Sequence, residues 1–319
     1  MVAQHVLCER HYLYPQKGKR VRMSYTVRTL AAEFLAVCAM VNAEKTVDNY
    51  RRYLEQFARH VGDKPIEELK PVDLLTWGTT WHQVQAVQRL FSWAVNDAEI
   101  ASRNPFKRVK KPRAGRRKRT LTKRQLLEMM RSTDREFRNF LLMMRETICR
   151  PQEARELQWE WIKSENPDHT PIDALRSGEA FFAVEEYKSR ERRADPDAVR
   201  VIPISARLAR FLLRLADESS EPHGIILENS KRRPWTANAV RLRMKRMRNR
   251  LGLKKDGRGE NVVCYTIRHT QATNAAAAGV RDKVLAEVMG HTSTRTTNRY
   301  QHLSANHLKE AMNKMRNPK

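Results

Sequence analysis

Residues that can act together on a phosphodiester are spread over positions 150–300 of this 319-residue chain. Tyr300 carries a phenol that can serve as a nucleophile. Arg150 and Arg268 carry guanidinium groups, which can each form paired hydrogen bonds to the non-bridging oxygens of a phosphate. His291 lies nine residues before Tyr300 and adds an imidazole. A phenol supported by two arginines and a histidine could take a DNA phosphodiester onto the protein without a metal ion.

Three short motifs surround these residues: Thr147-Ile-Cys-Arg150-Pro-Gln-Glu153, Ile267-Arg268-His269-Thr270 and Met289-Gly290-His291. They resemble the Thr-Gly-x-Arg-x-x-Glu, Leu-Arg-His-Thr and Leu-Gly-His elements of the tyrosine recombinases, also called phage integrases. The resemblance covers about residues 24–310. It implies a DNA transesterification in which Tyr300 cleaves one strand and forms a 3′-phosphotyrosyl bond.

The resemblance also implies a general acid and a supporting carboxylate. Glu186-Tyr-Lys188-Ser-Arg190, followed by Val-Arg-Val-Ile-Pro-Ile, is similar to the hairpin that carries the family's catalytic lysine. Lys188 is therefore the predicted acid for the leaving 5′ oxygen, with Arg190 as the alternative if the register is shifted. Glu153 would orient an arginine, or it is a glutamate that the helix dipole favours at a helix start.

One departure from the family pattern matters for the chemistry. Where the family usually has His-x-x-Arg, this chain has Tyr265-Thr-Ile-Arg268. A phenol can donate a hydrogen bond to a phosphate oxygen, but at neutral pH it accepts a proton poorly compared with imidazole. Deprotonation of Tyr300 must then depend on the field of the arginines or on another base. His269 matches the family's own Arg-His-Thr element, so it does not take over this role.

The charge of the chain indicates a polyanionic partner. Lys and Arg number 62 and Asp and Glu 36, which gives a formal net charge of +26, and a chain this basic is expected to meet nucleic acid. No stretch has the apolar length of a membrane span or the core of a signal peptide. We expect a prokaryotic, cytoplasmic, DNA-associated protein with reduced cysteines and with neither a metal nor a cofactor.

The sequence predicts two domains joined by a basic segment. Residues 103–124 contain no acidic residue and are expected to bury no core. The predicted parts are an irregular basic segment 1–23, a helical core-binding (SAM-like) domain 24–102, a linker 103–121 and a catalytic domain 122–319 that includes the C-terminal tail. The linker is either a solvated tether or lies along phosphates, which would neutralise its dense charge. Its predicted DNA contacts are Arg116, Arg117, Lys118 and Arg119.

Hydrophobic periodicity predicts a mainly α fold with one small β-sheet (α+β). Apolar residues three and four apart predict helices with faces that begin at Leu30, Val47 and Val84, and prolines bound a short helix. The remaining predicted elements are the short helix Val72–Trp77, a capping box at Thr122, helices at Phe137–Thr147, Ala237–Leu251, Thr270–Ala278 and Asp282–Met289, and strands at Phe181–Val184 and Val199–Ile202.

The helix predicted at Ala237–Leu251 is strongly basic. Arginine on an exposed helix can read guanine edges in the major groove or contact phosphates, and the alternative is a solvated basic face. The predicted DNA contacts of this helix and the following loop are Arg241, Arg243, Lys245, Arg246, Arg248, Lys254 and Lys255.

The sequence as a whole predicts a site-specific DNA recombinase or integrase that needs neither ATP nor a metal. The resemblance implies double-stranded DNA with specific recombination sites, a homotetramer assembled on that DNA, and accessory DNA-bending proteins as candidate partners. Two alternatives stay open. One is a type IB topoisomerase that relaxes strands with similar residues, and the other is a non-catalytic DNA-binding protein of the same fold, which Tyr265 suggests.

Overall fold

The computed structural model describes residues 25–112, 118–184, 199–219, 222–257 and 259–291. The chain divides into two compact units, Met1–Arg116 and Arg117–Lys319. Each unit has its own hydrophobic core. No helix in the described ranges is long and apolar enough to cross a membrane.

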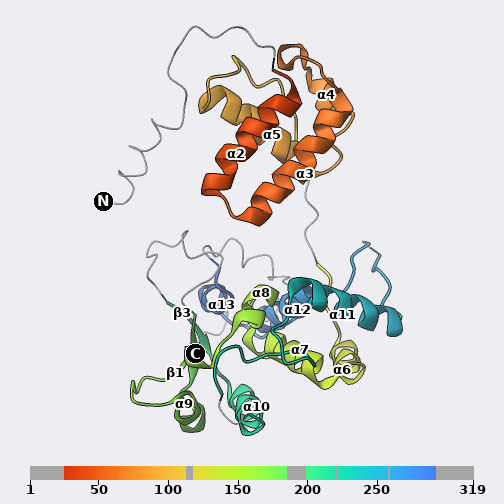
Figure 1. Ribbon diagram of the computed structural model, residues 1–319. Coiled ribbons are helices and arrows are strands. Elements are labelled where there is room, and N and C mark those ends of the chain that lie inside the picture. The colour runs from red at the N-terminus through yellow and green to blue at the C-terminus, as the bar shows by residue number, and fades with distance from the viewer. Residues whose placement is uncertain (1–24, 113–117, 185–198, 220–221, 258, 292–319) are drawn as a thin grey trace, which may run out of the picture. The chain divides into compact units, whose positions relative to one another are not determined.

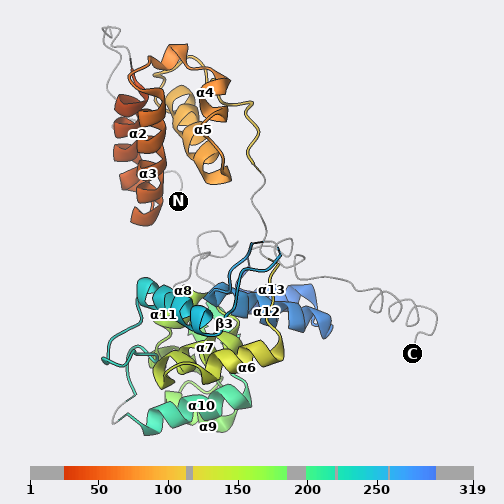
Figure 2. The same cartoon turned by 90° about the vertical axis from the view of Figure 1, so that its right-hand side faces the viewer.

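The first unit is a small helical bundle (Figures 1 and 2). The helices predicted from apolar periodicity are confirmed. Hydroxyl groups at Thr26 and Thr80 cap the first and the last of them. The short helix predicted at Val72–Trp77 is found one residue earlier and is shorter. The elements are α2 (Val27–Val41), α3 (Glu44–Val61), the 3₁₀ turn η2 (Ile66–Glu68), α4 (Pro71–Leu75) and α5 (Trp81–Asn96).

The core of this unit lies between α2, α3 and α5. The first two helices lie side by side in Figure 2, and α5 packs against both. Phe34, Leu54, Phe57 and Leu90 are at most 1% exposed. Burial of these apolar side chains is the main force that holds the bundle together.

The first core extends into the segment predicted to be a linker. Phe106 is fully buried, and its ring lies edge-on to Phe57 and Phe91 at centroid distances of 5.7 and 5.0 Å. Gln88 of α5 donates to the carbonyls of Phe106 and Val109 at 2.7 and 2.8 Å. The expectation that residues 103–124 bury no core residue is therefore wrong, because one ring and a bonded backbone hold the start of this basic segment in place.

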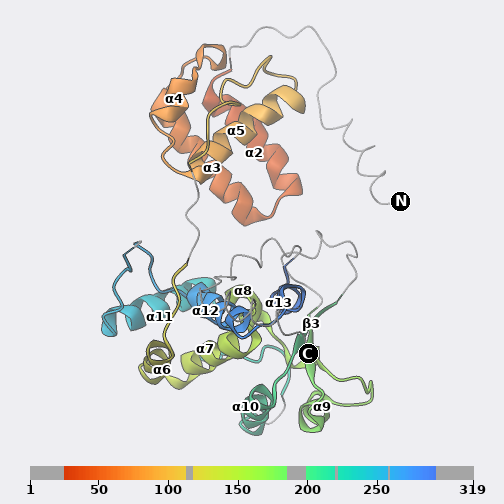
Figure 3. The same ribbon diagram turned by 180° about the vertical axis from the view of Figure 1, so that it is seen from behind.

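The second unit combines helices with a three-stranded sheet (Figures 1 and 3). Its elements are α6 (Lys123–Arg131), α7 (Arg135–Thr147), α8 (Pro151–Glu156), the 3₁₀ turn η3 (Trp159–Trp161), β1 (Ile162–Lys163), α9 (Pro171–Ser177), β2 (Phe181–Val184), β3 (Arg200–Pro203), α10 (Ala206–Asp217), α11 (Ala237–Arg250), α12 (Cys264–Ala277) and α13 (Asp282–Met289). The predicted capping box at Thr122 is confirmed.

The sheet is antiparallel in the order β1-β2-β3. Phe182 pairs with Ile162 on one side and with Ile202 on the other, and all three side chains are at most 1% exposed. One face of the sheet therefore enters the core. The two predicted strands are confirmed, with the second displaced by one residue. Strand β1 was not predicted, because two residues are too few to show an alternating pattern.

Helix α12 packs against α7, and α13 packs against α12 and β3. Figures 1 and 3 place α8, α12 and α13 at one end of the second unit and α9 with α10 at the other. The helix predicted at Thr270–Ala278 begins six residues earlier, at Cys264. Its first turns carry Arg268, His269 and Thr270, which are polar and nevertheless buried. Apolar periodicity could not reveal a helix whose buried face is polar.

The buried Phe106 predicts a measurable contribution to stability. Phe106→Ala leaves a cavity between Phe57 and Phe91 and should lower the free energy of unfolding of the first unit by about 3–5 kcal/mol. Urea unfolding, with hydrogen exchange to report on each unit, measures the loss. Lys107→Ala, at the exposed neighbouring position, should change stability by less than about 0.5 kcal/mol. Equal stability of the two variants would contradict the assignment of Phe106 to the core.

Candidate active site

Arg150 is fixed at the junction between α7 and α8. It is the residue before α8, and Pro151 opens the helix, a position where the missing N–H of proline has no cost. Glu153, three residues on, accepts from the Arg150 backbone N–H and from its Nη1, each at 2.6 Å. The carboxylate therefore holds both the backbone and the guanidinium of Arg150.

Ile148 adopts an unusual backbone conformation in the same junction. Its φ of 53° and ψ of 16° are left-handed, at the position where the resembling motif has glycine. For a β-branched residue this conformation costs roughly 1–3 kcal/mol. The Ile148 carbonyl accepts from Arg268 Nη1 at 2.6 Å. The strained turn therefore supplies a contact to the second arginine.

Arg268 lies on α12 and is fully buried. Besides its bond to Ile148, it donates through Nη2 to the Met289 carbonyl at 2.7 Å. Its Nε has no hydrogen-bond partner among the described residues. Burial lowers the pKa of the guanidinium from its ordinary value. The site thus contains a cation that is almost completely removed from water.

His291 follows the left-handed Gly290 that ends α13. Its side chain is buried, and its Nε2 lies 3.3 Å from Arg268 Nη2. An arginine can only donate, so Nε2 is the acceptor in this contact.

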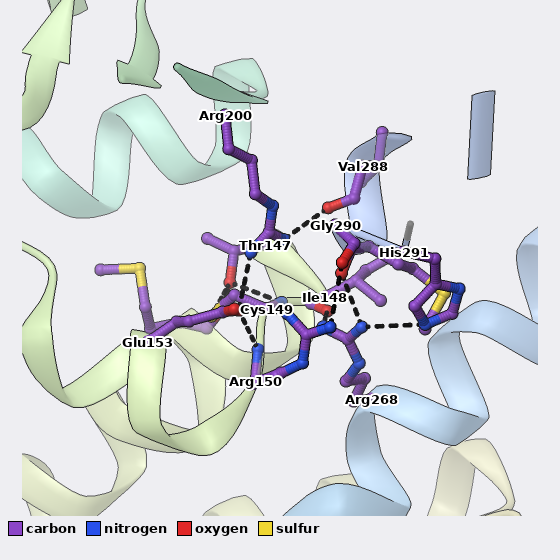
Figure 4. A network of polar contacts seen from close by, with 12 residues as sticks. Thr147, Ile148, Cys149, Arg150, Glu153, Arg200, Arg268, Val288, Gly290 and His291 are labelled. Atoms are coloured by element: carbon purple, nitrogen blue, oxygen red, sulfur yellow. Dashed lines mark hydrogen bonds and ion pairs between the residues drawn. The ribbon is translucent and has the colours of Figure 1, made fainter. Parts of the chain in front are cut away.

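Three consecutive carbonyls at the end of α13 each accept a hydrogen bond from a different arginine (Figure 4). A helix leaves its last carbonyls without intrahelical partners, and cations near this end are favoured. The pairs are Arg200 Nη2 with Val288 (2.7 Å), Arg268 Nη2 with Met289 (2.7 Å) and Arg150 Nη2 with Gly290 (2.9 Å).

Arg200 was not among the predicted site residues. It comes from β3, is 1% exposed, and its Nη1 lies 2.8 Å from Glu153 Oε2. Alternation along β3 places Arg200 on the same face as the buried Ile202. That inward position was the available signal, and it was hidden by the abundance of basic residues in the chain.

The charges of this cluster do not balance. Burial raises the pKa of Glu153, but the positive charges of Arg200 and then Arg150 lower it by more than burial raises it. The resulting pKa is about 2. The carboxylate is therefore ionised at neutral pH. Burial, and then the negative charge of Glu153, raise the pKa of Cys149 to about 11, so that thiol is neutral. The described contacts set one carboxylate against three guanidinium groups, and this arrangement suits an anionic ligand.

Tyr265 lies beside Arg268 on the first turn of α12. Its ring is half-buried, and the Arg268 guanidinium carbon lies 5.9 Å from the ring centroid. This distance is within the range of a cation–π contact. The structure therefore places Tyr265, the residue that stands where the family usually has histidine, next to Arg268.

A family model for the phage integrases matches residues 119–307, which is more than half of the chain. The chain belongs to the phage integrase family. Curated relatives include a tyrosine recombinase of Thermosipho africanus, 31% identical over 135 residues, and tyrosine recombinase XerC 2 of Ralstonia nicotianae, 30% identical over 116 residues. These matches cover 42% and 34% of this chain and 43% and 32% of the relatives, so each spans less than half of the relative's length.

Solved structures show the same fold. A lambda integrase dimer bound to a COC′ core site matches with a TM-score of 0.69 and 16% identity, over 94% of this chain and 85% of the other. The Tn1549 transposon integrase in complex with transposon right end DNA matches with a TM-score of 0.65 and 15% identity, over 92% of this chain and all of the other. The expected mainly helical fold with one small sheet is confirmed.

Several of the predicted site residues lie outside the described residues. They include the predicted nucleophile Tyr300 and general acid Lys188, the alternative Arg190, and the basic residues Arg116 and Arg117. The structure brings together the other predicted residues of the site, which are Arg150, Glu153, Tyr265, Arg268 and His291.

The basic segment before α6 contacts the loop after α11. The backbone N–H groups of Lys118 and Arg119 donate to the Glu260 carboxylate at 3.1 and 3.0 Å. Arg119 Nη1 donates to the Lys254 carbonyl at 2.7 Å. The guanidinium of Arg119 is thus used within the protein, whereas the Lys118, Lys254 and Lys255 side chains are exposed.

The basic helix α11 also divides into two groups of side chains. Arg243 forms an ion pair with Asp134, the residue that caps the start of α7, and Arg248 donates to the Val262 carbonyl at 3.2 Å. These two side chains hold α11 against its neighbours. The exposed members of the predicted DNA-binding set on this helix are Arg241, Lys245 and Arg246.

The depressed pKa of Glu153 predicts how stability depends on pH. A carboxyl that titrates at about 2 when folded and at its ordinary 4.5 when unfolded contributes about 3 kcal/mol of stability above pH 4.5. This contribution is lost as the pH falls from 4.5 towards 2. Glu153→Gln should therefore be less stable than the wild type at pH 7, and the difference should shrink across that acid range.

Urea unfolding at a series of pH values measures this difference. Glu156→Gln is the matched control, because Glu156 lies on the same helix, is 46% exposed and pairs loosely with Arg155 at 3.7 Å. It should change stability by less than about 1 kcal/mol. A Glu153→Gln penalty that stays constant from pH 7 to pH 3 would show that the Glu153 charge does not stabilise the site.

Proposed function

We propose that this chain is a site-specific DNA recombinase that cuts and rejoins DNA through a 3′-phosphotyrosyl intermediate. The observation that carries the proposal is the cluster of three arginines on the end of α13 with Glu153 as their carboxylate. Buried cations in excess of anions are costly unless a ligand neutralises them. A scissile DNA phosphate has the charge and the two acceptor oxygens that this cluster would bind.

The proposed reaction transfers a phosphoryl bond from DNA to protein and back. Arg150, Arg268 and His291 bind the non-bridging oxygens and stabilise the charge that develops on them. The Tyr300 oxygen attacks phosphorus, the bond from phosphorus to the 5′ oxygen breaks, and Lys188 donates a proton to that leaving oxygen. Attack by a 5′ hydroxyl then reverses these steps and releases Tyr300. The bond energy is conserved throughout.

The proton of Tyr300 must leave as attack proceeds. The excess positive charge of the arginine cluster favours the phenolate and so lowers the cost of this step. Tyr265 contacts Arg268 through its ring face, which supports a role as hydrogen-bond donor or wall of the pocket. His291 lies beside Arg268, and its imidazole is the candidate acceptor for the Tyr300 proton in this proposal.

Double-stranded DNA is the proposed partner, and a homotetramer is the proposed working assembly. One relative by fold is a lambda integrase dimer bound to a core site, and another is a lambda integrase tetramer bound to a Holliday junction. We infer that the helical first unit of this chain is the core-binding domain and the second the catalytic domain. The exposed cations Arg241, Lys245 and Arg246 supply candidate phosphate contacts.

Tyr300→Phe should abolish covalent attachment to DNA. The substitution removes the nucleophilic oxygen and little else, so affinity for a specific duplex should stay within about threefold of the wild type. Denaturing electrophoresis of the protein with a nicked duplex shows the adduct, and a gel-shift titration measures binding. Tyr12→Phe, in the basic N-terminal segment, is the control and should form the adduct normally. An adduct that persists in Tyr300→Phe would exclude this tyrosine as the nucleophile.

Tyr265 variants should show an ordered effect on cleavage. Tyr265→Phe keeps the ring beside Arg268 but loses one hydrogen bond, which is expected to cost about 1–3 kcal/mol of the barrier. Tyr265→His should equal or exceed the wild type near neutral pH, because imidazole both donates and accepts a proton there. Single-turnover cleavage of a nicked site ranks the three proteins. A folded, DNA-binding His variant without activity would mean that the pocket depends on the phenol itself.

A further inference from the structure

Arg200 joins three parts of the second unit at one buried point. It is part of β3, its Nη1 lies 2.8 Å from the Glu153 carboxylate at the start of α8, and its Nη2 donates to the Val288 carbonyl of α13 at 2.7 Å (Figure 4). Its side chain is 1% exposed. One planar guanidinium thus makes an ion pair through Nη1 and a hydrogen bond through Nη2, and an ammonium group cannot reproduce both with the same geometry.

The Arg200 contacts reach the two sides of the proposed phosphate site. Glu153 uses one oxygen, Oε1, for Arg150 Nη1, and the other, Oε2, for Arg200 Nη1 and the Arg150 backbone. Arg200 therefore restricts the carboxylate that orients Arg150. The position of Arg150 depends on a residue that does not itself belong to the motif around it.

The turn that carries His291 is shaped around the same guanidinium. A Cβ atom at Gly290 would lie 2.6 Å from Arg200 Nε and 2.8 Å from its Cζ. Gly290 also has a left-handed φ of 63°. Glycine is thus required twice here, once by backbone conformation and once because Arg200 occupies the space beside it. His291 is the next residue, so Arg200 also bounds the turn that places its imidazole.

We propose that Arg200 is a positioning residue, which aligns Arg150 through Glu153 and His291 through the Gly290 turn, and so couples strand β3 to the phosphate site. The inference rests on the proposed recombinase function. In the sequence, Lys188 lies twelve residues before Arg200, in the segment between β2 and β3. The strand that receives the chain after the proposed general acid is thereby fastened to the groups that bind the phosphate.

A role limited to stability predicts a different outcome from a positioning role. If the Arg200 ion pair only stabilises the fold, replacing Arg200 should lower the free energy of unfolding and leave the rate of cleavage by folded protein unchanged. If Arg200 is a positioning residue, replacing it should slow the cleavage step of folded, DNA-bound protein, because a small displacement of a catalytic group costs rate without costing affinity. The two roles are therefore separated by measuring cleavage and binding on the same preparation.

The first test is single-turnover cleavage of a nicked duplex by full-length wild type, Arg200→Met and Arg200→Lys. Loss of a charge-assisted contact should slow cleavage by Arg200→Met about 10- to 100-fold, with DNA affinity within about threefold. Arg200→Lys should fall between the two, because it restores the charge but not the planar guanidinium. Arg207→Met is the control, since Arg207 is exposed and pairs with Glu146 at 3.4 Å, and it should cleave like the wild type.

Wild-type rates in Arg200→Met, or in Arg200→Lys if the Met variant does not fold, would overturn the proposal. So would a loss of cleavage explained wholly by weaker DNA binding. A double-mutant cycle with Glu153→Gln adds a further check. If Arg200 acts through Glu153, the two effects should be far from additive, and simple additivity would contradict the proposed route.

A second readout does not depend on any activity. Glu153 faces Arg150 of α8, Arg200 of β3, Arg268 of α12 and the Cys149 thiol. Carbon NMR of labelled glutamate carboxyls should show a higher Glu153 pKa in Arg200→Met than in the wild type or Arg207→Met. An unchanged pKa would overturn the contact itself. A wild type that forms no covalent adduct would instead refute the recombinase function and leave this measurement decisive for Arg200.

Discussion

The carboxyl end of α13 fixes the positions of the three arginines of the candidate site, Arg150, Arg200 and Arg268. Its last carbonyls have no partners within the helix. Arg150, which precedes α8, Arg268 of α12 and Arg200 of β3 supply the missing hydrogen bonds. The partial negative charge of the helix end favours cations there. Because the three arginines come from distant parts of the sequence, their contacts with this one helix end hold the start of α8, α12 and β3 close together. The geometry of the site is thus fixed by the same contacts that close the core around α13.

Burial of these arginines carries a desolvation cost. Arg200 and Arg268 are removed from water almost completely, and the described contacts provide one carboxylate, Glu153, for the cluster. Carbonyl dipoles and that carboxylate offset part of the desolvation cost, and among the described residues positive charge remains in excess. Binding of an anion at this cluster should therefore stabilise the fold.

The sequence was sufficient to predict those residues that short motifs specify. Arg150, Glu153, Arg268 and His291 occur at fixed places within such motifs, and the structure brings them together. Arg200 was missed, because one arginine in a short strand carries little signal in a chain with 62 basic residues. The start of α12 was missed because its buried face is polar, and that face is polar because the site needs it. The packing of Phe106 was hidden by the charges around it. Local patterns thus predicted the elements and the motifs, whereas contacts between distant elements could not be read from them.

Two of the positions at which this chain differs from the family motifs, Ile148 and Tyr265, contact Arg268. Ile148 stands where glycine is usual and bonds Arg268 through its carbonyl, while Tyr265 stands where histidine is usual and contacts Arg268 through its ring. The left-handed backbone of Ile148 is strained, yet its side chain packs against the cluster of Ala272, Leu285 and Met289 between α12 and α13. The Ile148 side chain is only partly buried, so its packing offsets part of the strain. Packing and the hydrogen bond from Arg268 therefore stabilise the turn without the conformational freedom of a glycine. Arg268 is fully buried and is contacted by an aliphatic turn, an aromatic ring and the His291 imidazole.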